Sequence, residues 1–238
     1  HLTRLDSGFW YPEPPPLRTS REQHAEEELW DYSGDSRKHQ SMVRFIMHDI
    51  MNILEDGYIE QRMIAEYPGV LGQNLQARQA STFADMPTLS QVIENEPEQG
   101  HVWLTIQQAL LSYMKWGELK YGDTPLTDER VQVVFGLLPE LDKALLSRDL
   151  RDRCRAANLI MVRCWHYIKD FLDHCEEMAE QATPGGDDSV AVGILQQLVS
   201  ALAASRCSRT APSSGTRRGG RIARPITSIR PMFSFLMW

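Results

Sequence analysis

The sequence predicts an all-α protein, a multi-helix bundle built from long amphipathic helices. Apolar residues recur at three- and four-residue steps over long stretches, which is the spacing of one helix face. No stretch alternates apolar and polar residues over the length of a strand, and no internal repeat is visible. With 238 residues and 42% hydrophobic content, the chain is large and apolar enough to bury a core.

Changes in composition divide the chain into four parts. In order, these are an extended strap with a short acidic helix, the main helical domain, a linker with a terminal helix, and an Arg-rich tail. Their bounds are residues 1–35, 36–182, 183–205 and 206–238. The prolines near the start exclude a helix there, so we expect an extended N-terminus. The tail has no helical or strand period, which is typical of disorder.

The strongest single element is one amphipathic helix from Ser36 to Glu66. A shorter Glu-rich helix precedes it at residues 21–32, and Gly34 should interrupt the chain between the two. Either Asp35 or Ser36 can cap the long helix. Its end is expected at Tyr67-Pro68-Gly69, because the residue before a proline is pushed out of the α region.

Further helices are expected along the rest of the chain, each with one apolar face. Their ranges are 73–85, 102–117, 131–138, a short helix starting at Pro139, one long helix over 149–181, and 190–204. Thr88 and Gln91 are spaced as a capping box for another helix start. Thr127, followed by two acids, suits the N-terminus of the helix over 131–138.

The spacing of the cysteines indicates a cytoplasmic protein. Cys154, Cys164 and Cys175 are ten or eleven residues apart on one expected helix, hence about 15 Å from each other, so we expect reduced core thiols. No apolar run approaches the about 20 residues that span a bilayer, and no signal-peptide pattern opens the chain, so we expect no membrane partner. The start without Met indicates a fragment of a longer protein.

The net charge of −7 conceals an asymmetry. Residues 206–238 hold seven arginines and no acid, so residues 1–205 carry −14 (−7 minus 7). An acidic body disfavours nucleic acid as a partner, except through the tail. There, Arg217-Arg218-Gly219-Gly220-Arg221 resembles RGG-type RNA-binding segments. The abrupt loss of every acid after Ser205 also fits a reading-frame slip or an artificial chain end, so the tail is either an RNA contact or non-native.

Sequence motifs of common enzymes are missing from the chain. It contains no phosphate-binding loop, no paired Cys-x2-Cys zinc site and no His-Glu-x-x-His zinc-peptidase motif. We therefore assign no catalytic residue and expect no catalytic activity from this chain alone.

An acidic cluster lies on the long helix over 36–66. Asp49, Asp56 and Glu60 fall on one border of its apolar stripe at 3.6 residues per turn. A carboxylate at such a border can reach inward as a metal ligand or toward an arginine of a partner. Salt bridges that stabilise and solubilise the helix are the alternative explanation.

The run Asn52-Ile-Leu-Glu-Asp-Gly-Tyr-Ile-Glu60, followed by Glu66-Tyr67-Pro68-Gly69, resembles a family of large bacterial proteins. These are von Willebrand factor A (VWA) domain proteins related to the cobaltochelatase subunit CobT and the nitric-oxide reductase activation protein NorD. Tyr58 stands where many relatives have Arg. The resemblance covers about residues 40–180 and includes Lys120-Tyr121-Gly122-Asp123 and the run from Cys164 to Asp170.

The resemblance implies a helical region between an upstream zinc-peptidase-like segment and a downstream VWA domain. Proteins of this kind are expected to act with a MoxR-type AAA+ ATPase in metal insertion or protein remodelling. In them, an acid of this helix completes a zinc site with His-Glu-x-x-His. Carried over, the implied ligands are Asp56 first, then Glu55 and Glu60, with Asn52 and Asp49 as groups that support the ligands.

The chain departs from the family because it lacks both His-Glu-x-x-His and the VWA domain. We therefore expect zinc in the full-length protein and no cofactor in this chain alone. The expected partner is the ATPase or the remainder of the same protein. The alternative is a stand-alone helical protein-interaction module, with RNA contact through the Arg-rich tail.

Overall fold

A computed structural model describes residues 19–94, 102–182 and 189–205. Every regular element in these ranges is a helix, and none of the described residues forms a strand, so the all-α prediction is confirmed. None of the described helices is both long enough and apolar enough to cross a bilayer. The predictions for the proline-rich strap, the linker after residue 182 and the Arg-rich tail concern residues outside these ranges.

The described elements follow one another with short connections. They are α2 (Ser20–Asp35), α3 (Arg37–Glu66), α4 (Val70–Asp85), α5 (Leu89–Glu94), α6 (Val102–Trp116), α7 (Glu129–Leu146), α8 (Leu150–Arg163), α9 (Trp165–Ala182) and α10 (Ser189–Ser205).

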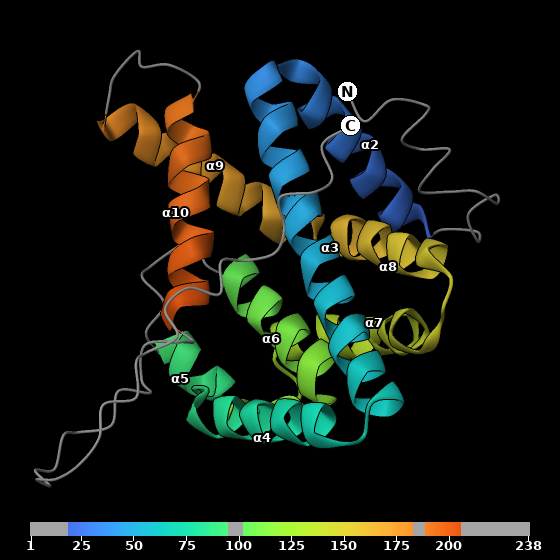
Figure 1. Cartoon of the computed structure of the whole chain (residues 1–238). Helices are drawn as coiled ribbons and strands as arrows, with labels where there is room; N and C mark the ends of the chain where they lie inside the picture. The colour runs from blue at the N-terminus through green and yellow to red at the C-terminus, as the bar shows by residue number, and fades with distance from the viewer. Residues whose placement is uncertain (1–18, 95–101, 183–188, 206–238) are drawn as a thin grey trace, which may run out of the picture.

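Helix α3 is the central element of the fold. It runs through the middle of the molecule and contacts α2, α4, α6, α7, α8 and α10 (Figure 1). Its apolar face is almost completely buried, as the periodicity predicts. Leu29 of α2 and Leu195 of α10 belong to the same buried cluster as Ile46, Ile50 and Leu54 of α3. One core therefore joins the N-terminal, central and C-terminal helices that the structure describes.

Both ends of α3 confirm the sequence prediction. Ser36 is the N-cap, and its hydroxyl accepts a hydrogen bond of 3.0 Å from the backbone N–H of His39. The helix ends at Glu66, and the backbone N–H of Tyr67 still bonds to the carbonyl oxygen of Met63 at 3.0 Å. The capping box of Thr88 and Gln91 is also confirmed.

Helices α2 and α4 extend beyond the bounds predicted for them. Helix α2 runs through Gly34 to Asp35 instead of ending at Tyr32; it starts behind a capping box in which Thr19 and Glu22 bond each other's backbone. Helix α4 begins at Val70, directly after the proline turn, rather than at residue 73.

The predicted break before Pro139 is wrong. Pro139 lies inside the single helix α7, and Asp128 rather than Thr127 is its N-cap. Proline disturbs a helix because it lacks the N–H and crowds the preceding turn. In that turn, the carbonyl oxygen of Gly136 accepts a hydrogen bond of 2.6 Å from Arg163 Nη1. This hydrogen bond joins α8 to the turn of α7 that precedes the proline.

The single helix predicted over 149–181 is also wrong, since the chain bends at Cys164 between α8 and α9. No proline or glycine marks this bend, so the sequence offers no local signal for it. Trp165, directly after the bend, is buried. Its ring packs edge-on against the ring of Tyr32 of α2, with 5.5 Å between the ring centres. Tertiary packing therefore overrides the helical pattern here.

The expectation of reduced core thiols is confirmed for the three cysteines within the described residues. Cys154, Cys164 and Cys175 are buried and free. Burial raises the pKa of Cys154 to about 11 and the pKa of Cys164 and Cys175 to about 12. The thiols are therefore protonated at neutral pH. Cys207 lies outside the described residues.

Helix α6 packs tightly against α3 at Gly57. A Cβ atom added to Gly57 would lie 2.7 Å from the carbonyl oxygen of Met114 and 2.9 Å from its Cβ. Gly57 and Met114 are both buried. Only a residue without a side chain allows this crossing, since the atoms it would meet include the backbone of α6.

We expect Gly57→Ala to lower the free energy of unfolding by about 2 kcal/mol, because overpacking against the α6 backbone exceeds the helix propensity gained. Urea unfolding followed by circular dichroism measures this. Gly136→Ala is the matched control, since nothing lies within 4 Å of a Cβ at that exposed helical glycine. It should raise the stability by about 0.5 kcal/mol. Equal effects of the two variants would contradict the close approach.

Candidate functional site

The acids on α3 occupy two sides of the helix. Asp49, Asp56 and Glu60 are all partly buried, as their position at the border of the apolar stripe predicts. Asp49 and Glu60 both bond side chains of α6. Glu55 points to α8 instead, where it meets Arg153. The structure therefore separates Glu55 from the other predicted ligands.

Glu55 belongs to a buried clamp between α3 and α8. Its carboxylate accepts a hydrogen bond of 2.8 Å from Arg153 Nε, and the Arg153 side chain is only 6% exposed. Arg153 Nη1 also donates to the carbonyl oxygen of Ser147 at 3.0 Å, and the guanidinium lies 3.9 Å from the centre of the Tyr58 ring. The Tyr58 ring thus covers an arginine supplied by another helix.

Glu60 links three helices. Its carboxylate accepts hydrogen bonds from Lys115 Nζ of α6 at 3.2 Å and from Gln79 Nε2 of α4 at 2.7 Å. Arg78 Nη2 lies 3.7 Å away. These donors compensate the charge of Glu60 within the fold.

The two residues predicted to support the ligands make other contacts. Asp49 accepts a hydrogen bond from the side-chain amide of Gln107 on α6. Asn52 is exposed, and its Nδ2 lies 3.1 Å from Nδ1 of His48, one turn earlier on α3. Neither of these side-chain contacts involves Asp56.

Asp56 differs from the other acids of the helix. It is partly buried, yet no hydrogen bond joins its carboxylate to a described residue. Burial raises the pKa of Asp56, Lys115 opposes this by favouring the charged form, and Glu60 and Glu55 raise the pKa further. The fold therefore holds a poorly compensated carboxylate at the border of its central helix.

The described residues do not form a complete metal site. Nowhere in the described ranges do three or more His, Cys, Asp or Glu side chains come together in a way that could hold a metal ion. The Asp56 carboxylate fits a single ligand position, because its oxygens are not engaged by the fold. To bind a metal ion, Glu55 would have to break its ion pair with Arg153, and Glu60 would have to break its ion pair with Lys115. A metal at Asp56 would thus need further ligands from outside the described residues.

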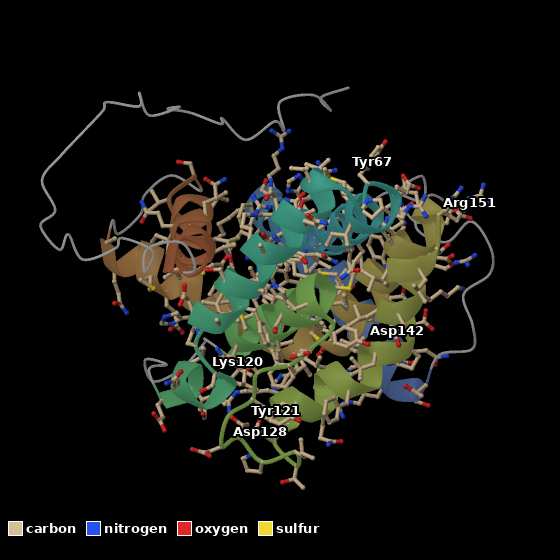
Figure 2. All side chains as sticks on the ribbon, turned by 60° about the horizontal axis from the view of Figure 1, so that its bottom comes forward. Tyr67, Lys120, Tyr121, Asp128, Asp142 and Arg151 are labelled. Atoms are coloured by element: carbon tan, nitrogen blue, oxygen red, sulfur yellow. The ribbon has the colours of Figure 1, made fainter. Side chains whose placement is uncertain are left out.

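Sequence reasoning missed the cations that organise this region. Lys115 and Arg153 were not singled out, because each lies far in sequence from the acid it meets and has no local signature. Lys120 was noted only as part of a motif. Figure 2 shows Lys120 and Tyr121 on the connection between α6 and α7.

Lys120 caps the C-terminus of α4. Its Nζ donates to the carbonyl oxygens of Phe83, Ala84 and Met86, at 3.0, 2.9 and 2.8 Å. A cation at this end also meets the negative end of the helix dipole. Gly122 follows with φ of +60°, and a Cβ there would lie 2.5 Å from the hydroxyl oxygen of Ser90. This motif therefore fastens the α4–α5 corner to the α6–α7 connection.

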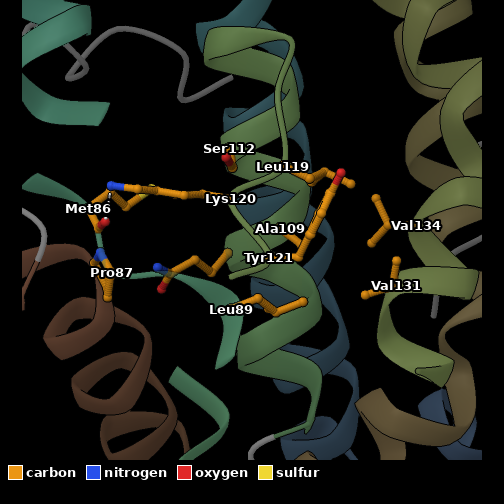
Figure 3. A pocket seen from close by; sticks show the side chains of 11 residues that line it. Met86, Pro87, Leu89, Ala109, Ser112, Leu119, Lys120, Tyr121, Val131 and Val134 are labelled. Atoms are coloured by element: carbon orange, nitrogen blue, oxygen red, sulfur yellow. Dashed lines mark hydrogen bonds between the residues drawn. The ribbon is translucent and has the colours of Figure 1, made fainter. Parts of the chain in front are cut away.

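A small apolar pocket lies beside this corner. It encloses about 350 Å³ with its open mouth included, and Lys120 crosses toward Met86 at one side (Figure 3). Val131 and Val134 of α7 and Leu89 of α5 line its walls. The Lys120 ammonium is already bonded to carbonyls, so the pocket offers shape and apolar surface but no free charge.

Comparison of the chain with protein-family models, with curated proteins and with solved structures gives no match.

Replacing Asp56 should change the pH dependence of stability. Folding raises the pKa of Asp56 above its usual value of 3.8, so the folded state binds the proton more tightly than the unfolded state does. The free energy of unfolding therefore falls as the pH rises from 3.8 through the pKa of the folded state. We therefore expect Asp56→Asn to be more stable than the wild type at pH 7, and the difference to shrink toward pH 3.8. Urea unfolding at a series of pH values measures it.

The control for this series is Asp170→Asn, which removes a mostly exposed acid from α9. It should show no comparable gain at pH 7. A wild type as stable as Asp56→Asn at pH 7 would mean that the Asp56 carboxylate is well compensated after all.

Lys120→Met should lower the free energy of unfolding by about 2 kcal/mol, because three carbonyls at the end of α4 lose a charged donor. Lys169→Met is the control, since Lys169 makes an exposed i,i+4 ion pair with Asp173 that contributes roughly 0.5 kcal/mol. Thermal unfolding of both variants provides the comparison. If the two variants lose the same stability, Lys120 is an ordinary surface lysine.

Proposed function

We propose that this chain is the helical segment of a CobT-like VWA protein, which acts with a MoxR-type AAA+ ATPase in metal insertion or protein remodelling in the cytoplasm. In this proposal α3 contributes Asp56 to a zinc site, and histidines from outside the chain complete it. The chain alone is not active.

The observation that carries the proposal is the state of the Asp56 carboxylate. A partly buried acid without a hydrogen-bond donor reduces stability when it is ionised. A folded protein commonly retains such a cost where the residue serves function. A zinc ion would supply the positive charge that Asp56 lacks, since carboxylate oxygen is an accepted zinc ligand.

Other residues of the run that carries the family resemblance, Asn52 to Glu60 and Glu66 to Gly69, have structural roles, which leaves the role of metal ligand to Asp56. Glu55 is held by Arg153, and Gly57 permits the crossing with α6, so both fix the position of α3. Pro68 lies in the turn after α3. Among the acids of the run, Asp56 is the one whose carboxylate makes no hydrogen bond to a described residue, whereas Glu55 and Glu60 are both bonded.

The coding sequence on both sides of the chain provides the first test. We expect a His-Glu-x-x-His motif encoded before His1 and an Asp-x-Ser-x-Ser motif of a VWA domain encoded after Ser205. Finding neither would overturn the proposed family.

Metal analysis of the full-length protein tests the role of Asp56. We expect about one zinc per chain in the purified wild type, and a loss of zinc affinity of 10-fold or more in Asp56→Asn, since a direct ligand is removed. The control Asp170→Asn should retain its zinc. Unchanged zinc content in Asp56→Asn, with the protein folded by circular dichroism, would exclude Asp56 as a ligand.

A stand-alone interaction module is the second candidate, favoured by the seven arginines without an acid in residues 206–238. In that case the full chain would bind single-stranded RNA at low salt, and deletion of residues 206–238 would abolish binding. A filter-binding titration with a generic RNA distinguishes the two candidates. The interaction module predicts RNA binding that depends on residues 206–238, whereas the CobT-like segment predicts no RNA binding.

A further inference from the structure

Exposed apolar side chains gather at one corner of the molecule. Of the eight large apolar residues exposed in the described part of the chain, six lie on the last turns of α3, the start of α4 and the connection of α7 to α8. We call this the α3/α8 corner. Its apolar members are Ile59, Tyr67, Val70, Leu71, Leu146 and Leu150.

An ion pair shows that these segments lie side by side. Glu66, the last residue of α3, is 3.9 Å from Arg148 Nη2 on the α7–α8 connection. Ile59 precedes Glu66 by two turns and therefore lies on the same face of α3. Tyr67 and Arg151 accordingly appear at the same edge of the molecule in Figure 2.

The degree of exposure at the α3/α8 corner is high for apolar side chains. Val70 is 76% exposed and Leu146 is 79% exposed. Single exposed leucines are common on protein surfaces, whereas a group of six bordered by charges is typical of an interaction site. The corner is thus a candidate for contact with another molecule.

The charges around this corner have both signs. Arg148 and Arg151 are exposed, and so are Glu66 and Asp149. The Arg151 side chain makes no hydrogen bond or ion pair with a described residue. A border of one sign would fit a partner of the opposite sign, while a border with both signs can complement a copy of itself after a two-fold rotation.

The acidic charge of residues 1–205 restricts where two copies of the chain could meet. Residues 1–205 carry a net charge of −14, so most pairings of two copies are repulsive. At the α3/α8 corner, arginines offset the acids, and apolar side chains are available for burial between the copies.

We propose that the α3/α8 corner is the interface of a two-fold symmetric dimer of this chain. Each copy buries the apolar residues of the corner against the same residues of the other. The Arg151 side chain of one copy, which makes no ion pair with a described residue of its own chain, faces Asp149 of the other copy. This proposal does not depend on the zinc site, because Asp56 is not part of the corner.

Sedimentation velocity of the full chain at physiological salt tests the proposed dimer. Protein concentrations of about 1 to 100 µM are suitable, because they bracket the micromolar dissociation constants of modest interfaces. We expect a dimer that dissociates on dilution. Leu146→Asp and Val70→Asp should each raise the dissociation constant at least about 10-fold, because each inserts a charge into the apolar centre. Both side chains are mostly exposed, so folding should be retained in both variants.

The matched control is Leu126→Asp, which makes the same change at a 52% exposed leucine on the α6–α7 connection. It should dimerise like the wild type. A wild type that stays monomeric to about 100 µM overturns the proposal, and so does a dimer that persists in both corner variants or is lost equally in Leu126→Asp.

Discussion

The fold depends on the close crossing of α3 and α6 at Gly57. Because no side chain separates the two helices there, the backbone of α6 at Met114 lies directly against α3. Trp103, Ile106, Leu110 and Met114 of α6 are almost completely buried in the same core as the apolar face of α3. The other described helices contact α3 or the elements that cover it. Gly57 thus allows the close contact between the central helix and α6.

Around this crossing, electrostatics distinguishes the acids of α3. Arg153 from α8 and Lys115 from α6 reach Glu55 and Glu60, and both contacts bridge residues distant in sequence. Asp56, between them on the helix, makes no hydrogen bond to a described residue, and the positive charge of Lys115 only partly opposes the effects of burial and of the neighbouring acids on its pKa. The same helix therefore carries acids that hold the fold together and one acid that the fold compensates poorly.

The sequence was sufficient to predict features that depend on local pattern. The extent of α3, its Ser36 cap, its end before Pro68 and the capping box at Thr88 all follow from periodicity and side-chain chemistry. The two wrong predictions both concern where one helix ends and the next begins. Helix α7 continues through Pro139, and the bend at Cys164 has no local marker, so the pattern alone could not predict either.

For the candidate site, periodicity predicted the partial burial of Asp49, Asp56 and Glu60. It could not predict which acid would remain without a donor, because that depends on where Lys115 and Gln79 lie in space. The resemblance named Asp56 first, and its zinc-binding role stays a prediction. The structure gives a reason for the residues of the Lys120-Tyr121-Gly122-Asp123 motif. Lys120 donates to three carbonyl oxygens at the end of α4, and Gly122 has the positive φ that the chain requires beside the same α4–α5 corner.

The bend between α8 and α9 has a consequence for the dynamics of the molecule. Cys154, Cys164 and Cys175 lie before, at and after it, and all three thiols are buried and protonated. A thiol reagent can modify them only when the surrounding helices separate, since the reactive thiolate requires water. The chain therefore carries three native reporters along one pair of helices, and their relative rates of alkylation would reveal which part of the core opens first.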